Sequence, residues 1–251
     1  MPMVEVNGVW KTYHNHPRLG IKERLVRRRA VAEEGRFARS WALQDISFRV
    51  DAGRSLGILG HNGTGKSTLL SLILGTIKED RGAIIRKGRI GGMLELGSGC
   101  HPDLTGRENI YLNGSILGLR IAEIRQKFDS IIAFSELGPA VDLPMRTYSS
   151  GMSARLAFSV LAHAYRDVML IDEILAVGDA GFQAKCAAYF SDYRAKGGTL
   201  IVVSHDLNSL QELCADGIWL HEGRVVEHGP IETTIDSYRN YIVGSTEPAS
   251  A

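Results

Sequence analysis

The stretch "GILGHNGTGKST", residues 57–68, constrains the fold of this chain more than any other. The apolar run over residues 56–59 predicts a strand, and residues 68–74 predict a helix. Between them, Gly60, four further residues and then Gly65-Lys66-Ser67 match the spacing G-x-x-x-x-G-K-[ST]. A glycine-rich loop at the start of a helix gathers free N–H groups and the positive end of the helix dipole, which favours an anion. We therefore expect an α/β fold with a phosphate-binding loop.

The residue types in this loop indicate a nucleoside triphosphate as the ligand. Glycine allows the backbone to wrap a phosphate without a Cβ clash. Lys66 can reach the β- and γ-phosphates, and the Ser67 hydroxyl can ligate Mg²⁺. The expected nucleotide-binding residues are Gly60, His61, Asn62, Gly63, Thr64, Gly65, Lys66, Ser67 and Thr68, and Lys66 is also an expected catalytic residue.

Two apolar strands later in the chain each end in polar residues. These are "VMLIDE", residues 168–173, and "TLIVVSHD", residues 199–206, and the helical pattern between them predicts a parallel sheet buried on both faces. Ligands of such sheets bind at the carboxyl ends of the strands, so we expect Asp172 to hold Mg²⁺ together with Ser67. Glu173 is expected to orient or deprotonate the attacking water, an effect of about 10²–10⁴-fold in rate. His205 is expected to contact the γ-phosphate.

The remaining pattern predicts further elements around this core. Residues 3–9 and 41–50 alternate as strands do, with Leu43, Ile46 and Phe48 as inward positions. "AIIRKGRIGGML" predicts two short strands around a Lys-Gly turn. Residues 105–165 are helical, and Thr105 with Glu108 forms a predicted capping box. A hairpin turning at Glu222-Gly223 and a closing helix near residues 230–242 end the pattern.

Composition excludes some classes of function. The chain has 251 residues and no apolar run near the ~20 residues that a membrane span needs. Its net charge is only +1, so we expect no nucleic-acid partner. The three cysteines share no close spacing and are expected to be reduced thiols. Residues 14–40 differ from the rest: eight Lys or Arg against three Glu give a local net charge of +5, mixed with apolar residues as in an interfacial helix. The small, polar residues 246–251 predict a disordered tail.

Five motifs in this order, "GHNGTGKST", "YSSGM", "LIDE", "AVGD" and "SHD", resemble those of the nucleotide-binding subunit of an ABC transporter. The resemblance covers nearly the whole chain. It implies a P-loop NTPase cassette with a RecA-like parallel-sheet core, an N-terminal antiparallel β part and a helical subdomain at approximately residues 100–165. Residues 1–245 would then form a single nucleotide-binding domain that hydrolyses ATP.

The resemblance also assigns roles to single residues. Asp172 resembles the Walker B magnesium ligand, Glu173 the catalytic glutamate, His205 the switch histidine and Asp179 the D-loop aspartate. Tyr13 resembles the aromatic residue that stacks on adenine, with Trp41 as a rival because the insertion blurs the alignment. The signature motif corresponds to Ser149, Ser150, Gly151 and Met152, where "YSSGM" departs from the usual LSGGQ-like sequence, and Glu95 replaces the Q-loop glutamine.

Further likeness places the chain near one branch of this family. "MLELGSGCHPDLTGRENIYLNGSILGL" and "LIDEILAVGDAGFQAKC" resemble the ATPase subunits of bacterial polysaccharide exporters. That resemblance implies a homodimer in which the signature of one subunit closes over the ATP of the other, bound to two copies of a transmembrane permease at the cytoplasmic face of the inner membrane. The cargo would be a lipid-linked glycan of O-antigen or capsule type.

One further expectation concerns the domains, and two alternative functions stay open. No C-terminal carbohydrate-binding domain is expected after the closing helix. The alternatives are the ATPase of another ABC exporter, for a drug, haem or ion, and a soluble, non-transport ABC ATPase.

Overall fold

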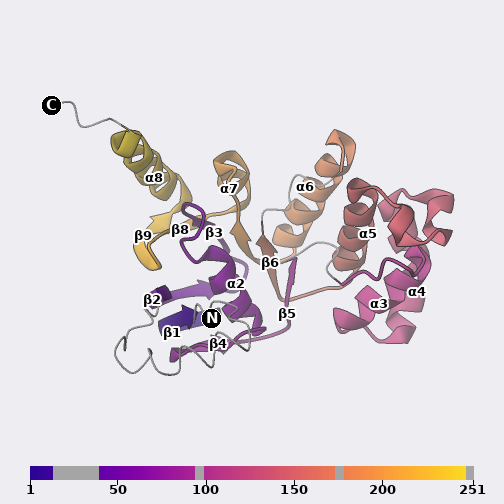
Figure 1. Cartoon of the computed structure of the whole chain (residues 1–251), viewed down its shortest axis with the longest axis horizontal. Helices are drawn as coiled ribbons and strands as arrows, with labels where there is room; N and C mark the ends of the chain where they lie inside the picture. Colours follow the sequence, from indigo (N-terminus) through magenta and orange to yellow (C-terminus); the bar gives the residue numbers. More distant parts are fainter. Residues whose placement is uncertain (14–39, 94–98, 173–177, 247–251) are drawn as a thin grey trace, which may run out of the picture.

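The computed structural model describes residues 1–13, 40–93, 99–172 and 178–246. Two β-sheets and a set of helices make up these ranges, with the helices α3 (Gly106–Ile116), α4 (Ile121–Ser135) and α5 (Ser150–His163) grouped at one end (Figure 1). The basic insertion at 14–40 and the tail at 246–251 fall almost entirely outside the described residues. Glu95 and Glu173 lie outside them as well.

The N-terminal β part is a three-stranded antiparallel sheet. Its order is β2-β1-β4, with β1 at Pro2–Tyr13, β2 at Ser40–Asp51 and β4 at Arg81–Arg86. The alternating residues of β2 bury one face, and Leu43, Ile46 and Phe48 are all inside, as predicted. The three-residue step from Leu43 to Ile46 follows from Asp45, whose positive φ of 54° lies at an irregularity in the β1–β2 register.

The second sheet has six strands in the order β5-β6-β7-β3-β8-β9. The first five run parallel and the last pair is an antiparallel hairpin. The central strands β3, β6 and β7 are almost entirely buried, because helices or the other sheet cover both faces. The bounds are β3 at Ser55–Leu59, β5 at Ile90–Met93, β6 at Val168–Asp172, β7 at Thr199–Val203, β8 at Asp216–His221 and β9 at Arg224–Pro230.

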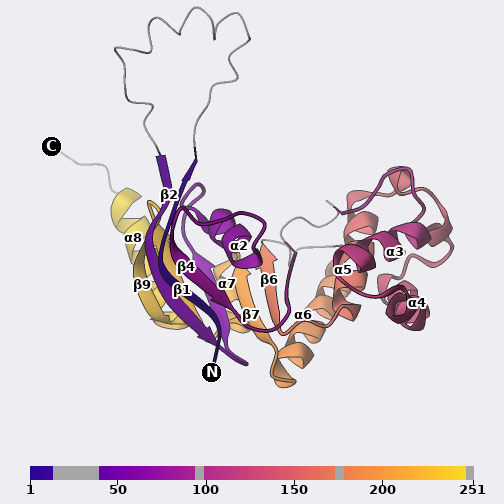
Figure 2. The same ribbon diagram turned by 90° about the horizontal axis from the view of Figure 1, so that it is seen from below.

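Helix α2, Lys66–Leu74, lies between the two sheets (Figure 2). Its residues Leu69, Leu70, Leu72 and Ile73 are fully buried in a core that joins both sheets. On the other face of the six-stranded sheet, a second core packs α6, Ala180–Ala195, α7, Leu207–Leu213, and α8, Ile231–Thr246. The strand β3 that leads into the phosphate loop is therefore held from both sides.

The helical subdomain has its own apolar core. It consists of α3, Gly106–Ile116, α4, Ile121–Ser135, and α5, Ser150–His163, with short 3₁₀ turns at Gly138–Asp142 and Met145–Thr147. The predicted capping box is present: the Thr105 side chain accepts from the Glu108 N–H, and Glu108 Oε2 accepts from the Thr105 N–H at 2.8 Å. None of the described helices is both long and apolar enough to cross a membrane.

Two features differ from the sequence expectations. The strands around the Lys87-Gly88 turn both form, but they belong to different sheets, since β4 pairs with β1 while β5 pairs with β6. The seven-residue helix α7 was not predicted. Its cap is Asp206, which accepts from the N–H groups of Asn208 and Ser209.

Candidate functional site

The phosphate loop closes on itself around the Lys66 ammonium. Lys66 Nζ donates to the carbonyl oxygens of Gly60 at 2.7 Å and His61 at 2.9 Å, and only 5% of its surface is exposed. The Thr64 hydroxyl donates to the same His61 oxygen at 2.9 Å. The His61 carbonyl oxygen thus accepts hydrogen bonds from two side chains of the loop, those of Thr64 and Lys66.

Glycine is required at the two ends of this loop. Gly60 and Gly65 have φ values of 147° and 102°, and a side chain at either would collide with backbone. At Gly60 the obstacle is the carbonyl oxygen of Leu220, and at Gly65 it is that of Ala42. Gly65 also caps α2 without any side-chain bond, so the first N–H groups of the helix stay available to an anion.

The strand register brings the later candidates to the same edge of the sheet. Asp172 pairs with Val203 of β7, which pairs in turn with Ile58 of β3, two residues before Gly60. His205 follows Val203 by two residues and is exposed. Strands are about 4.8 Å apart, so Asp172 and His205 lie within about two strand spacings of the phosphate loop. Ser67, in the first turn of α2, is exposed near this edge.

The predicted signature and D-loop residues meet in a second place. Ser149, Ser150, Gly151, Met152 and Asp179 line one hollow of about 530 Å³ together with Ala154, Arg155 and Gly178. Ser149 caps α5, because its hydroxyl accepts from the Met152 N–H at 3.1 Å. Asp179 caps α6 by accepting from the Phe182 N–H at 3.0 Å, and this bond lowers the pKa of Asp179. None of the residues that line this hollow belongs to the phosphate loop.

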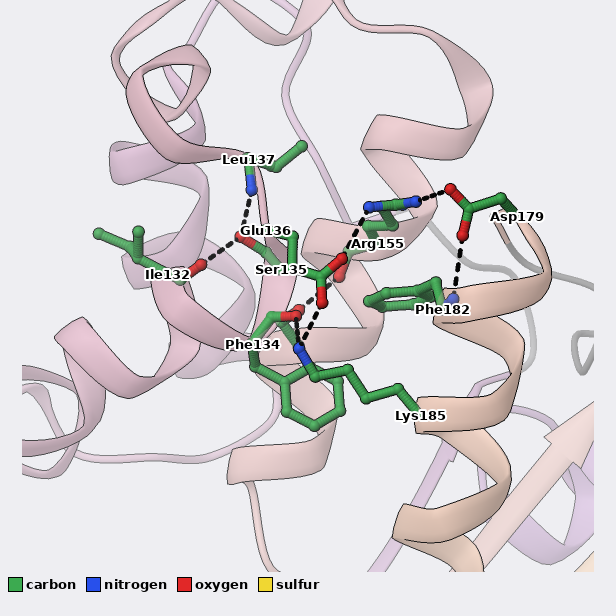
Figure 3. Close-up of polar contacts among 10 residues, drawn as sticks. Ile132, Phe134, Ser135, Glu136, Leu137, Arg155, Asp179, Phe182 and Lys185 are labelled. Carbon is green, nitrogen blue, oxygen red and sulfur yellow. Dashed lines mark hydrogen bonds and ion pairs between the residues drawn. The ribbon is translucent and has the colours of Figure 1, made fainter.

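Arg155, which the sequence analysis did not single out, joins these parts (Figure 3). Its guanidinium forms ion pairs with Asp179 and with Glu136, the residue that ends α4. It also lies over the Phe182 ring, 5.0 Å from the centroid. Lys185 of α6 pairs with the same Glu136 at 2.9 Å. The network thus ties the signature helix to α4 and α6.

The two rivals for adenine stacking lie in different surroundings. Tyr13 is 46% exposed, and its phenolic oxygen accepts from Thr68 of the phosphate-loop helix at 3.4 Å. Trp41 packs edge-on against Trp10 at 5.0 Å, and the Arg81 guanidinium lies over its ring. Trp41 is therefore engaged in a protein contact, whereas Tyr13 stands beside the loop.

The residue next to Tyr13 is held by a carboxylate. Asp80 Oδ2 accepts from the backbone N–H of Thr12 at 2.6 Å and from its hydroxyl at 2.8 Å. Asp80 Oδ1 accepts from Lys11 Nζ at 3.2 Å. These bonds, the backbone one above all, lower the pKa of Asp80. They fix the end of β1, and with it the position of Tyr13.

Comparison with known protein families resolves the class. The family model described as "ABC transporter" matches residues 43–176, which include the phosphate loop, the signature and the end of β6. The chain belongs to the ABC transporter family. The family's ATP-binding and ATP-hydrolysing activity is therefore that of this cassette, and the predicted fold and enzyme class are confirmed.

Particular relatives of this ABC cassette are similar over most of the chain. It is 42% identical over 240 residues to the O-antigen export system ATP-binding protein RfbB of Klebsiella pneumoniae, covering 95% of this chain and 98% of that protein. It is 42% identical over 202 residues to the teichoic acids export ATP-binding protein TagH of Lactococcus lactis, covering 80% and 43%. A solved dimeric structure of the ATP-binding cassette MJ0796 bound to ADP and Pi has a TM-score of 0.71 at 22% identity, covering 91% and 99%.

The structure of this ABC cassette groups the predicted residues into two clusters. The phosphate loop, Asp172 and His205 share the edge of the six-stranded sheet, and the signature shares its hollow with Asp179. Arg155 was missed because its partners, Glu136 and Asp179, are 19 and 24 residues away and no local pattern connects them.

Proposed function

We propose that this cassette powers the export of a lipid-linked polysaccharide, of O-antigen or capsule type, across the bacterial inner membrane. The observation that carries the proposal is the 42% identity over nearly the full length of both chains to an O-antigen export ATP-binding protein. The teichoic acids export relative supports the same branch, because both relatives are named as ATP-binding proteins of export.

Hydrolysis in this proposal takes place at the edge of the six-stranded sheet. Residues 60–68 hold the phosphates, and the Lys66 ammonium, now on two loop carbonyls, transfers to the β- and γ-phosphates. Glu173 orients the attacking water and His205 contacts the γ-phosphate. Tyr13 stacks on the adenine, a contact of about 1–3 kcal/mol.

Ser67 and Asp172 are the proposed ligands of Mg²⁺. Both supply the hard oxygen donors that Mg²⁺ prefers, and such sites commonly combine one or two protein ligands with substrate phosphates. When bound, the ion neutralises charge on the β- and γ-phosphates. The exposed Ser67 hydroxyl and the carboxylate at the end of β6 suit this role.

A homodimer completes the proposed site. ABC exporter cassettes generally dimerise, and the hollow lined by Ser149 and Asp179 contains no phosphate-loop residue of its own chain. A second copy placed head to tail would bring its nucleotide into that hollow, where the N-terminus of α5 favours an anion. The dimer would bind two copies of a multi-spanning permease at the cytoplasmic face of the membrane, and the glycan would contact the permease.

The first experiment separates binding from hydrolysis. Glu173→Gln should bind ATP, lose hydrolysis and accumulate as an ATP-bound dimer, measured by nucleotide retention and light scattering. Asp192→Asn, on the exposed face of α6, is the matched acid-to-amide control and should hydrolyse ATP as the wild type does. Wild-type hydrolysis by Glu173→Gln would refute the role of this residue.

The second experiment tests the cargo. A strain lacking this gene should accumulate lipid-linked glycan inside the cell and lose surface polysaccharide, and the wild-type gene but not Glu173→Gln should restore it. Normal surface polysaccharide in the deletion strain would favour another exporter. Absence of the protein from washed membranes that contain the permease would favour a non-transport ATPase.

A further inference from the structure

The first side chain after Gly60 contacts the last helix of the chain. The His61 ring lies 5.5 Å from the Tyr238 ring and 6.5 Å from the Tyr241 ring, centroid to centroid. These residues are about 180 positions apart in sequence. With Trp219 and His221 at the end of β8 they form one aromatic group, which we name the closing-helix cluster.

The α8 side of the cluster is firmly anchored. Ile231 and Ile235 are buried against the six-stranded sheet, and the fully buried Thr234 donates to the carbonyl oxygen of Pro230 at 3.0 Å. Tyr238 packs on Trp219 with centroids 5.8 Å apart and is itself buried. Helix α8 therefore offers a fixed surface to the phosphate loop.

The loop side is the part that needs support. Gly60, Gly63 and Gly65 all have positive φ, so the backbone there lacks the restraint that side chains provide. His61 is the one aromatic residue within the loop at residues 60–65. Its carbonyl oxygen accepts from both Thr64 and Lys66, so holding the His61 ring holds the acceptor around which the loop closes.

The closing-helix cluster also contains buried polar atoms. Tyr241 Oη lies 3.4 Å from His221 Nε2, but the buried atoms His221 Nδ1 and Trp219 Nε1 have no hydrogen-bond partner among the described residues. Buried polar groups are normally satisfied, and exceptions concentrate where function constrains the arrangement. Both atoms belong to β8, whose residue Leu220 lies directly against Gly60 of the phosphate loop.

We propose that Tyr238 and Tyr241 of α8 are positioning residues for nucleotide binding, acting through His61 to pre-form the phosphate loop. This rests on the phosphate loop being the ATP site, as proposed above. The closing helix would then set the affinity for ATP without touching the nucleotide. Loss of the contact would weaken binding and leave turnover at saturating ATP nearly unchanged, because bound ATP would itself order the loop and place Lys66 on the phosphates.

Tyr241→Ala is the main test, because Tyr241 is 38% exposed and its removal leaves the core of α8 intact. We expect the Kd for ATP and the KM to rise about fivefold, with kcat nearly constant. Hydrogen exchange in the nucleotide-free protein should rise in residues 57–65 and stay constant in β6 and β7. Tyr241→Phe, which keeps the ring, should restore both values. Val243→Ala, which shortens an exposed side chain on the same helix, should behave as the wild type.

A double-mutant cycle distinguishes positioning from general destabilisation. His61→Ala combined with Tyr241→Ala should raise the Kd for ATP no more than the larger single change, because both remove the same contact. Additive effects on Kd, or unchanged loop exchange in a folded Tyr241→Ala protein, would overturn the proposal. Failure of the wild-type protein to bind ATP would instead refute the site itself.

Discussion

Arg155, on the helix that begins in the signature, forms an ion pair with Asp179, the residue that caps α6. Asp179 is 69% exposed by its side chain whereas Arg155 is only 17% exposed, so a partly buried cation holds a carboxylate that lines the hollow. The ion pair thus connects α5 to the start of α6. In the proposed dimer, the two walls of the hollow would approach a second copy as one unit.

Replacing Arg155 by Met should remove the ion pair that connects α5 to the start of α6, the two sides of the hollow. Exposed ion pairs contribute about 0.2–1 kcal/mol each, so the free energy of unfolding should fall only by about 1 kcal/mol. The ATPase rate should fall further, by about fivefold, because the signature helix and Asp179 are no longer held together. Arg107→Met is the matched control, since Arg107 also combines an ion pair, with Asp142, and a ring contact, with Phe128, away from the hollow. Equal ATPase losses in the two variants would contradict this role.

Asp80 should affect ATP affinity from outside the site. Asp80→Ala removes the acceptor of two Thr12 bonds, so the end of β1 and Tyr13 lose their fixed position. We expect the Kd for ATP to rise about threefold to tenfold, since a positioned stacking contact is weakened. Asp51→Ala, which removes an exposed carboxylate at the other end of the same sheet, is the control for titration calorimetry. An unchanged Kd for ATP in Asp80→Ala would contradict the proposed stacking of Tyr13 on the adenine.

Stability should depend on pH through His163. Partial burial lowers the pKa of His163 below its ordinary value of 6.5, and the ring packs edge-on against Phe134. Between the folded pKa and 6.5 the unfolded chain binds more protons, so stability falls as pH drops through this window. The urea midpoint of the wild type should therefore fall more between about pH 7.5 and 5.5 than that of His163→Gln. His228→Gln, which replaces an exposed histidine, should show the same change of urea midpoint with pH as the wild type. Parallel curves for all three proteins would exclude His163 as the source of the pH dependence.

The three thiols should react in a fixed order. Burial raises the pKa of Cys186 and of Cys214 to about 12, and it raises that of the half-buried Cys100 as well. Only the thiolate attacks, so a maleimide at neutral pH should label Cys100 first and the other two only after unfolding. Peptide mass spectrometry on wild type and Cys100→Ser gives the order. Early labelling of Cys186 in the folded protein would contradict its burial.

Local signals predicted much of this molecule. The capping box at Thr105 and the phosphate loop depend on residues three to eight positions apart, and both form as expected. The pairing of β4 and β5 with different sheets depends on partners far along the chain, so the Lys87-Gly88 turn gave no indication of it. Helix α7 did carry a signal, the cap residue Asp206 followed by leucines at 207, 210 and 213, but seven residues are too few to stand out. The His61–Tyr241 contact had no local signal, because the two residues are about 180 positions apart in the sequence.

Arg86 connects the two sheets through α2. From β4 its guanidinium donates to the carbonyl oxygens of Leu72 and Ile73, where α2 ends, while α2 begins in the phosphate loop. The antiparallel sheet, which carries Tyr13, is thus bonded to the helix that would hold the phosphates in the proposed function. If Tyr13 stacks on the adenine as proposed, the Arg86 bonds hold that stacking surface at a fixed place relative to the loop that would bind the phosphates.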